Sequence, residues 1–448
     1  MNPLGIRADP RHRTVLESRI VESLLLAGWN FELRAGERAR ALPEAVAALN
    51  RCVERGLPFA QGVGGERRFD PPEVVNFIKS MSLDGRDSFW EDRIVATGRR
   101  LVADHHGESA KVSVPPAPKA LGPRAFHVTL VREFNPAGWA VGGRVRVRLP
   151  LPLEDEGLRD LIVVPDLASD IGAQITIAPG RLDVRLPVPR EGTLTLGAHL
   201  SFTAYPTFPV AHAAPLAPAE IELYTRTNEG VASISPRIRT LAEGLAGGLK
   251  DPWQVVLRFW NYLLDRWKLG MVRYNELDAR HPADTLLDTQ WYDCQLGSGM
   301  LVALCRASGI PARIVSGYLL YPTAPVYHYW AEVAIEGRGW VPVDSICADL
   351  SSMGRDRAWR DYFLGQLDYR MKTQCLPRLF TGNPSVRFPP AWHILSRPEP
   401  AGVEIGYYAC DSGELIYADR VGVERGPATP VSDELPPDAV SRMNAGPL

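Results

Sequence analysis

The sequence predicts an α+β protein of several domains, on three observations. Residues 1–112 carry helix-start signals and are expected to form a helical region. Over residues 126–209 apolar and polar side chains alternate with a period of two between Gly and Pro turns, which is typical of a β-sandwich, expected at 120–215. Residues 220–425 mix helical and strand patterns, so we expect an α/β domain that ends in C-terminal strands, followed by a flexible tail at 426–448.

The helical signals of the first region are local. Thr14 and Glu17 form a capping box before an apolar-periodic run, and Asp70 with the two prolines after it marks a second helix start. The PPAP run at 115–118 reads as a linker to the strand-rich part.

Composition limits the classes of function. The chain has 448 residues, which suggests about three domains. With a formal net charge of -2 there is no electrostatic reason to expect a nucleic-acid partner. The sequence shows neither an apolar stretch that could span a bilayer nor a secretory signal, so no membrane partner is expected. Six cysteines without a CxxC pair do not describe a disulfide framework or a zinc site, and a reducing, cytoplasmic location is expected.

Two helices are predicted in the α/β region. Asp251 and Pro252 start the first, which carries an apolar face at helical spacing made of Val256, Phe259, Trp260, Leu263, Leu264 and Trp267. The second helix runs from about Cys294 to Ser308, because Asp293 is a good N-cap and the Gly309-Ile310-Pro311 run stops a helix.

Cys294 therefore falls in the first turn of a helix. Free backbone N–H groups and the positive end of the helix dipole favour a thiolate there, which is what a catalytic thiol requires. The same segment also fits a small buried cysteine, and taken alone it favours neither reading. Cys305 lies in the middle of the helix among apolar residues and is expected to be a core residue.

A β-hairpin is predicted next. Residues 328–335 and 339–344 are strand-like around a Glu-Gly-Arg-Gly turn, so His328 and Asp344 lie at the same end of the hairpin. If residues are paired outward from the turn, His328 and Asp344 are offset by roughly three residues along the strands, which corresponds to about 10 Å. By itself, a histidine at the edge of a strand is more often structural than catalytic.

The three residues together favour chemistry. A thiol at a helix start, a histidine on a strand and an aspartate on the partner strand are the parts of a nucleophilic site. In such a site the thiolate attacks a carbonyl carbon, the imidazole shuttles the proton and the carboxylate fixes the imidazole tautomer.

These segments resemble the core of the transglutaminase-like superfamily. In that family a cysteine opens a helix that ends in a GIPAR-type turn, followed by H-x-W-A-E-V and then G-W-x-x-x-D. This chain has Cys294, the run 309–313, His328 followed by Tyr329-Trp330-Ala331-Glu332-Val333, and Gly339-Trp340 with Asp344. The strand-rich part and the YFLGQLDYRM segment fit bacterial members more loosely, and the resemblance does not extend to residues 1 to about 110.

The resemblance implies a papain-like α/β core with an antiparallel sheet and a thioester acyl-enzyme. An oxyanion in such a site is held by the backbone N–H of the cysteine and an upstream side-chain donor, for which the candidates are Gln290, Trp291 and, third, Trp260. Tyr292, Tyr327 and Tyr329 are candidates to line the substrate cleft, although aromatic residues beside a catalytic loop are often packing.

The expected function is cysteine-dependent acyl transfer on an amide bond of a peptide or protein-like substrate, as a peptidase, an amidase or a transglutaminase-like enzyme. One alternative is an amide-forming acyltransferase of small-molecule biosynthesis, which takes an acyl group from a carrier-protein thioester and passes it to an amine. Another is a peptide-binding protein without catalysis. No cofactor and no metal are expected, since thiol acyl transfer needs neither, and the oligomeric state is left open.

Overall fold

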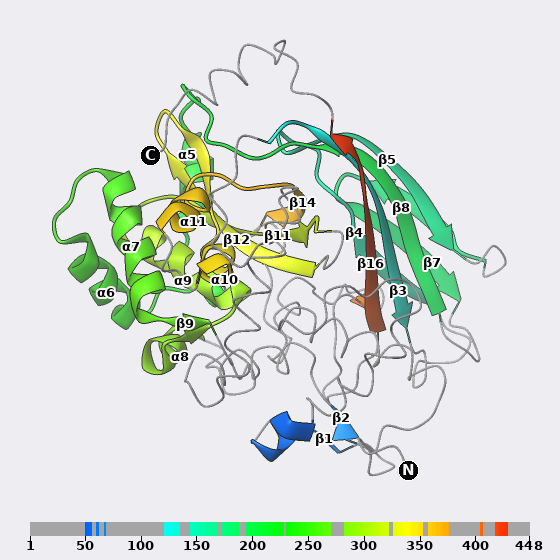
Figure 1. The fold of residues 1–448 in the computed structure, drawn as a ribbon, viewed down its shortest axis with the longest axis horizontal. Helices are drawn as coiled ribbons and strands as arrows, with labels where there is room; N and C mark the ends of the chain where they lie inside the picture. The colour runs from blue at the N-terminus through cyan, green and yellow to red at the C-terminus, as the bar shows by residue number, and fades with distance from the viewer. Residues whose placement is uncertain are drawn as a thin grey trace.

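The structure is a computed structural model, and the elements below are labelled as in Figure 1. It describes residues 50–55, 60–61, 67–68, 121–134, 144–167, 172–187, 194–227, 230–269, 282–321, 326–352, 357–375, 404–405 and 417–428.

Eight strands form two four-stranded sheets on one side of the molecule (Figure 1). In spatial order, the first sheet contains β16 (Tyr417–Ala428), β3 (Arg124–Phe134), β8 (Leu194–Ala204) and β5 (Leu158–Leu167). The second contains β15 (Glu404–Ile405), β4 (Arg144–Pro150), β7 (Arg181–Pro187) and β6 (Gln174–Ala178). The C-terminal strands β15 and β16 thus pair with β4 and β3, although the sequence grouped them with the α/β domain. The stacking of the two sheets as a sandwich stays a prediction.

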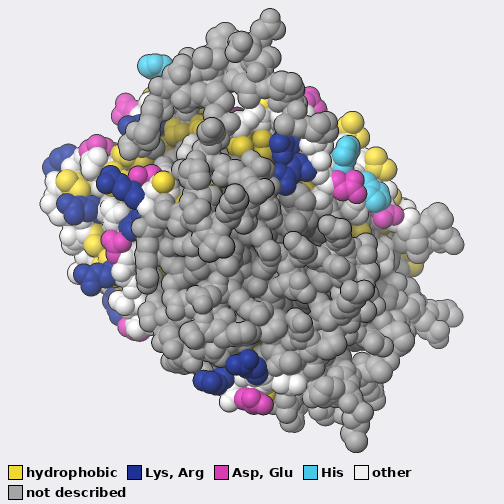
Figure 2. Space-filling view, viewed as in Figure 1, with side chains coloured by type: hydrophobic (Ala, Val, Ile, Leu, Met, Phe, Trp, Pro, Cys, Tyr) yellow, Lys and Arg dark blue, Asp and Glu magenta, His cyan; other side chains and the backbone are white. Residues whose placement is uncertain are grey.

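The period-two alternation does place one face of these strands inside the protein. In β7, Leu182, Val184 and Leu186 are fully buried, while Arg185 and Pro187 are exposed. The edge strand β5 turns Ile162 and Val164 to the outside, and hydrophobic side chains lie next to histidine and acidic ones along that rim of the molecule (Figure 2).

The helices of the α/β region gather on the opposite side (Figure 1). They are α5 (Pro218–Tyr224), the short 3-10 helix η1 (Gly230–Ala232), α6 (Pro236–Ala246), α7 (Pro252–Arg266), α8 (Pro282–Thr289) and α9 (Cys294–Ala307), followed after the sheet by α10 (Ser345–Ser352) and α11 (Arg357–Tyr362). The short strands β9 (Lys268–Leu269) and β10 (Trp291–Tyr292) pair in parallel between α7 and α9.

An antiparallel sheet completes this region. Its spatial order is β13 (Gly339–Val343), β12 (Val326–Ile335), β11 (Ala312–Leu319) and β14 (Arg370–Cys375). Helix α9 packs against β12 and β11, with Leu296, Met300, Leu301 and Leu304 fully buried as predicted. Helix α7 packs against α9 through the predicted apolar face.

Helix α9 begins and ends where the sequence predicts. The Asp293 carboxylate accepts a hydrogen bond from the N–H of Leu296 at 2.9 Å, and Gly309 after the helix has a φ of 74°, a left-handed conformation that suits glycine. Cys305 is fully buried, and burial raises its pKa well above the usual range of a thiol, so it is an inert core residue.

The predicted helical character of residues 1–112 is described only in part. Residues 50–54 are helical, whereas β1 (Ala60–Gln61) and β2 (Arg67–Arg68) form an antiparallel pair that the helical prediction did not include. The two predicted helix starts at Thr14 and Asp70 lie outside the described residues. Among the helices that are described, none is both long and apolar enough to cross a membrane.

Strand β14 and the segment before it connect the α/β region to the strand-rich region. Leu367 and Thr207 exchange two backbone hydrogen bonds of 2.9 Å. The hydroxyl of Tyr369 donates to the carbonyl of Gly122 at 2.6 Å. Lys372 contributes its carbonyl to the N–H of Leu153 at 2.7 Å. These bonds hold β14 to the strand-rich region on one side, and its antiparallel pairing with β11 holds it on the other.

A buried ion cluster lies at the same junction. The carboxylate of Glu332 on β12 accepts two hydrogen bonds from Arg313, at 2.9 and 2.6 Å, and lies 2.9 Å from the ammonium of Lys372. That ammonium is also 2.7 Å from Asp155 of the strand-rich region. Burial alone would raise the pKa of Glu332, but the two cations lower it to about 2.

Replacing Glu332 by glutamine is expected to lower the free energy of unfolding at pH 7 by about 3 kcal/mol, because Arg313 and Lys372 lose their shared carboxylate and Lys372 is left with Asp155. The folded-state pKa of about 2 lies below the unfolded value, so the carboxylate contributes stability above about pH 4.5, and that contribution is lost as the pH falls toward 2. Urea unfolding at pH 7, 4 and 2 measures both effects.

The control is Arg237→Gln, which removes the exposed ion pair of Arg237 with Asp288 and is expected to change little. Equal unfolding free energies for wild type and Glu332→Gln at pH 7 would contradict the stabilising role of the cluster.

Candidate active site

Cys294 is the first residue of α9 and is partly buried. The Asp293 side chain caps the N–H of Leu296, and the Asp293 carbonyl accepts the N–H of Gly297 at 2.8 Å. The thiol thus stands at the N-terminal end of a 14-residue helix, where the helix dipole stabilises negative charge. Sequence and structure agree on this position.

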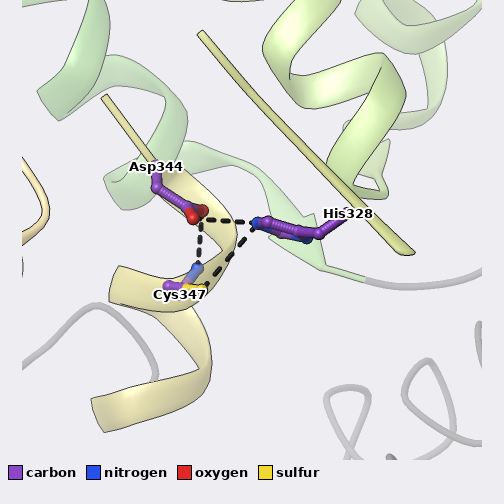
Figure 3. Close-up of side chains that lie close together, drawn as sticks. All are labelled: His328, Asp344 and Cys347. Carbon is purple, nitrogen blue, oxygen red and sulfur yellow. Dashed lines mark hydrogen bonds and ion pairs between the residues drawn. The ribbon is translucent and has the colours of Figure 1, made fainter. Parts of the chain in front are cut away.

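His328 and Asp344 form a buried dyad. The Nε2 atom of His328 lies 2.8 Å from the Oδ2 atom of Asp344 (Figure 3). His328 is the third residue of β12, and Asp344 directly follows β13.

The strand register explains why these two side chains meet. Ala331 pairs with Val343, so Asp344 continues to the position opposite Trp330, two residues from His328. The count from sequence gave a stagger of roughly three residues. A stagger of two keeps both side chains on one face of the hairpin, because side chains alternate along a strand, so a diagonal contact closes the gap without a bulge between β12 and β13.

Asp344 is held by three groups. Its Oδ2 atom faces the imidazole, and its Oδ1 atom accepts the backbone N–H of Cys347 at 3.0 Å, which caps the start of α10. Arg370 on β14 donates to Oδ2 at 3.3 Å. Burial would raise the pKa of Asp344, but His328, Arg370 and the Cys347 amide lower it to about 2, so the carboxylate is ionised at neutral pH.

The orientation of the dyad assigns roles to the two ring nitrogens. Nε2 faces the carboxylate, which leaves Nδ1 for exchange of a proton with a thiol. An ionised carboxylate on one nitrogen fixes the ring and stabilises the imidazolium that forms when the other nitrogen takes a proton.

Cys347 is a site neighbour that the sequence did not single out. Its sulfur lies 3.8 Å from Nε2 of His328 (Figure 3). Burial, followed by the negative charge of Asp344, raises the pKa of this thiol well above its usual range, so it stays protonated. Its location three residues after the capping aspartate, in Asp-Ser-Ile-Cys, is the sequence signal that places it beside the dyad.

His328, Asp344 and Cys347 each have a nitrogen, oxygen or sulfur atom that could bind a metal ion. These three atoms lie within 4.8 Å of one another, a spacing that suits a set of metal ligands. The guanidinium of Arg370 contacts two of the three, Oδ2 of Asp344 at 3.3 Å and the sulfur of Cys347 at 3.4 Å. The positive charge beside these three residues is therefore supplied by Arg370, a residue of the protein itself.

The three candidate oxyanion donors differ in their surroundings. Gln290 follows α8 with a φ of 55° and is exposed. Trp260 on α7 is buried, and its indole N–H has no hydrogen-bond acceptor among the described residues. The side chain of Trp291 lies outside the described residues. Of the two candidates whose side chains are described, Trp260 is the buried one, and its unsatisfied indole N–H is a property that it shares with Trp253, Trp267 and Trp330.

The three candidate cleft tyrosines are largely packed. Tyr292 is fully buried, and its ring lies so close to Gly297 that a Cβ there would be 2.3 Å from a ring atom; it therefore packs inside the protein, contrary to the prediction that it lines the cleft. Tyr329 is also buried, with its ring 5.4 Å from that of Tyr327. Tyr327 is half-buried and donates to the hydroxyl of Ser316 at 2.8 Å.

Comparison with known proteins gives a family for part of the chain. Residues 239–345 match the family model of the Transglutaminase-like superfamily. No curated protein matches the chain.

Solved structures show weaker similarities. A candidate cysteine protease from Cytophaga hutchinsonii is 16% identical, with a TM-score of 0.38, over 56% of this chain and 81% of that one. The periplasmic domain of TgpA from Pseudomonas aeruginosa is 18% identical, with a TM-score of 0.31, over 55% of this chain and 98% of that one. The segment matched by the family model contains Cys294 and His328 and ends just after Asp344, so the similarity covers the dyad and the helix-tip thiol.

Proposed function

We propose that this protein is a cysteine-dependent acyl-transfer enzyme in which Cys294 is the nucleophile, His328 its base and Asp344 the residue that orients the base. One observation carries the proposal. His328, which makes a buried 2.8 Å contact with Asp344, lies on β12, and the helix opened by Cys294 packs against that strand.

In the first half-reaction the Cys294 sulfur attacks the carbonyl carbon of an amide in a peptide or protein-like substrate. A sulfur–carbon bond forms, the carbon–nitrogen bond breaks, and His328 gives the leaving amine the proton that came from the thiol. In the second half-reaction water or an amine attacks the thioester, His328 accepts its proton, and the sulfur leaves. Asp344 stays ionised throughout.

Negative charge develops on the carbonyl oxygen during both attacks. The proposed first donor to this oxygen is the backbone N–H of Cys294, and the proposed second donor is the indole N–H of Trp260, which has no acceptor among the described residues.

Trp260→Phe removes this donor while keeping most of the apolar volume, and kcat is expected to fall by roughly 10²-fold with little change in KM. Steady-state kinetics on a thioester substrate measure it. Trp253→Phe is a matched control, because Trp253 is buried on the same helix and its indole N–H also has no acceptor among the described residues. Equal losses in the two variants would show that the effect is one of packing.

The experiment that tests the proposed function incubates the full chain with a glutaminyl peptide or a small acyl thioester, with and without an excess of a primary amine, and follows products by mass spectrometry. Free acid alone identifies hydrolysis, and an amide product identifies transfer to an amine, including the carrier-protein reaction. Absence of turnover that depends on Cys294 would contradict the proposal and favour peptide binding without catalysis.

A further inference from the structure

We propose that Arg370 is a positioning residue of this site, which keeps the carboxylate of Asp344 directed at His328 by bridging it to a second buried carboxyl, Asp368. The inference deepens the proposed function and rests on it, because it concerns the orientation of the same dyad.

The guanidinium lies between the two carboxyls. Its Nη2 atom donates to Oδ2 of Asp344 at 3.3 Å and lies 2.8 Å from Oδ1 of Asp368. The hydroxyl of Tyr321 donates to the other oxygen of Asp368 at 2.7 Å. All of these residues are buried, so the contacts act at low effective dielectric.

Charge balance shows what the bridge does. Asp344 and Asp368 bring two carboxyls into one buried site, and two carboxylates in such a site resist joint ionisation unless a cation lies between them. Arg370 is that cation. Burial raises the pKa of Asp368, whereas the pKa of Asp344 is held at about 2, so the bridge leaves Asp344 as the fully ionised partner of the imidazole.

The guanidinium also shares the Oδ2 atom of Asp344 with the imidazole. Arg370 and the imidazole therefore contact the same carboxylate oxygen, and the guanidinium anchors that oxygen where it faces the ring. The charged or titratable groups around this oxygen are His328 from β12, Cys347 from α10, and Arg370 with Asp368 from β14 and the residues before it.

The backbone of Arg370 is held in place, because Arg370 is the first residue of β14. Its neighbour Tyr369 donates a hydrogen bond to the carbonyl of Gly122, and the ring of Tyr369 lies 5.3 Å from that of Phe126. The rings of Tyr321 and Phe363 lie 5.8 and 5.9 Å from the guanidinium carbon. The strand-rich region thus contributes to the site through the position of Arg370.

The test compares wild type with Arg370→Met, Arg370→Lys and the charge-neutral double variant Arg370→Met/Asp368→Leu, all in the full chain. The double variant removes both members of the Arg370–Asp368 ion pair and so leaves neither charge buried alone. It is therefore expected to fold even if Arg370→Met does not. The readouts are kcat and KM as functions of pH and the titration of the His328 ring by NMR. The His328 signal is identified by its absence from the spectrum of His328→Gln.

Removing the guanidinium takes a positive charge away from the imidazole and frees the Asp344 carboxylate to turn away from the ring. The His328 titration midpoint is expected to rise by at least about half a pH unit, with kcat falling about 10- to 100-fold at pH 7 and KM changing less than about threefold. Arg370→Lys keeps a cation but has a shorter reach and a different donor geometry, so its His328 midpoint and its kcat are expected to fall between those of wild type and Arg370→Met.

Folded variants with the wild-type midpoint and the wild-type pH profile would overturn the proposal, even if their melting temperatures were lower. The NMR titration does not require turnover. A wild-type protein without activity that depends on Cys294 would refute the proposed function, whereas an unmoved His328 midpoint would refute the role of Arg370.

Discussion

Replacement of Cys294 by alanine is expected to abolish acyl transfer, with a loss in kcat/KM of at least about 10³-fold, while the protein remains folded. The side chain is partly buried at a helix tip, so the substitution removes one sulfur atom and little packing. Without the thiol no covalent intermediate forms, and the oxyanion donors that remain act only on uncatalysed attack by water.

The matched control is Cys305→Ala on the same helix. Cys305 is fully buried, and its pKa is raised by burial, so its loss is expected to cost some stability but no activity. Steady-state kinetics at several enzyme concentrations, with circular dichroism on each variant, make the comparison. Equal losses of activity in two folded variants would remove Cys294 from the role of nucleophile.

Asp344→Asn is expected to lower kcat/KM at neutral pH by about 10²- to 10⁴-fold. The asparagine oxygen can still cap α10 at the N–H of Cys347, so the backbone geometry is retained. The change removes the negative charge that faces Nε2 and allows the imidazole to adopt the other tautomer, in which Nδ1 carries the proton and cannot accept one from the thiol.

This variant also leaves Arg370 with Asp368 as its remaining carboxylate partner among the contacts described above. A pH–rate profile of Asp344→Asn therefore separates charge from geometry, because alkaline conditions that ionise the thiol directly should recover part of the rate. A profile identical to that of wild type would show that Asp344 does not act on His328.

Local sequence signals predicted the elements that carry the site. Asp293 as the cap of α9, Gly309 as its end and the turn of the β12–β13 hairpin are each set by a few neighbouring residues. The same is true of α7, where Asp251 caps the helix and the apolar stripe is buried. Such features follow from the backbone preferences of a few residues and from the spacing of apolar side chains, and both can be read from a single sequence.

The interactions that the sequence did not predict join distant segments. Arg370 at the start of β14 meets Asp344, which directly follows β13, although these strands are at opposite edges of the sheet, and no spacing in the chain relates the two residues. The exact stagger of His328 and Asp344 depends on the register of the hairpin, which a count about the turn misjudged by one residue. The C-terminal strand β16 was grouped with the α/β domain by order in the chain, yet its partner is β3.

The most direct test is to trap the acyl-enzyme. The full chain is mixed with a slowly hydrolysed acyl thioester, quenched in acid and examined by intact-mass and peptide mass spectrometry, with Cys294→Ala, His328→Gln and Cys347→Ser run in parallel. We predict one acyl group on Cys294, formed at least about 10²-fold more slowly in His328→Gln and absent in Cys294→Ala. An acyl group carried instead by Cys347 or another residue, or one that forms equally fast without His328, would contradict the account.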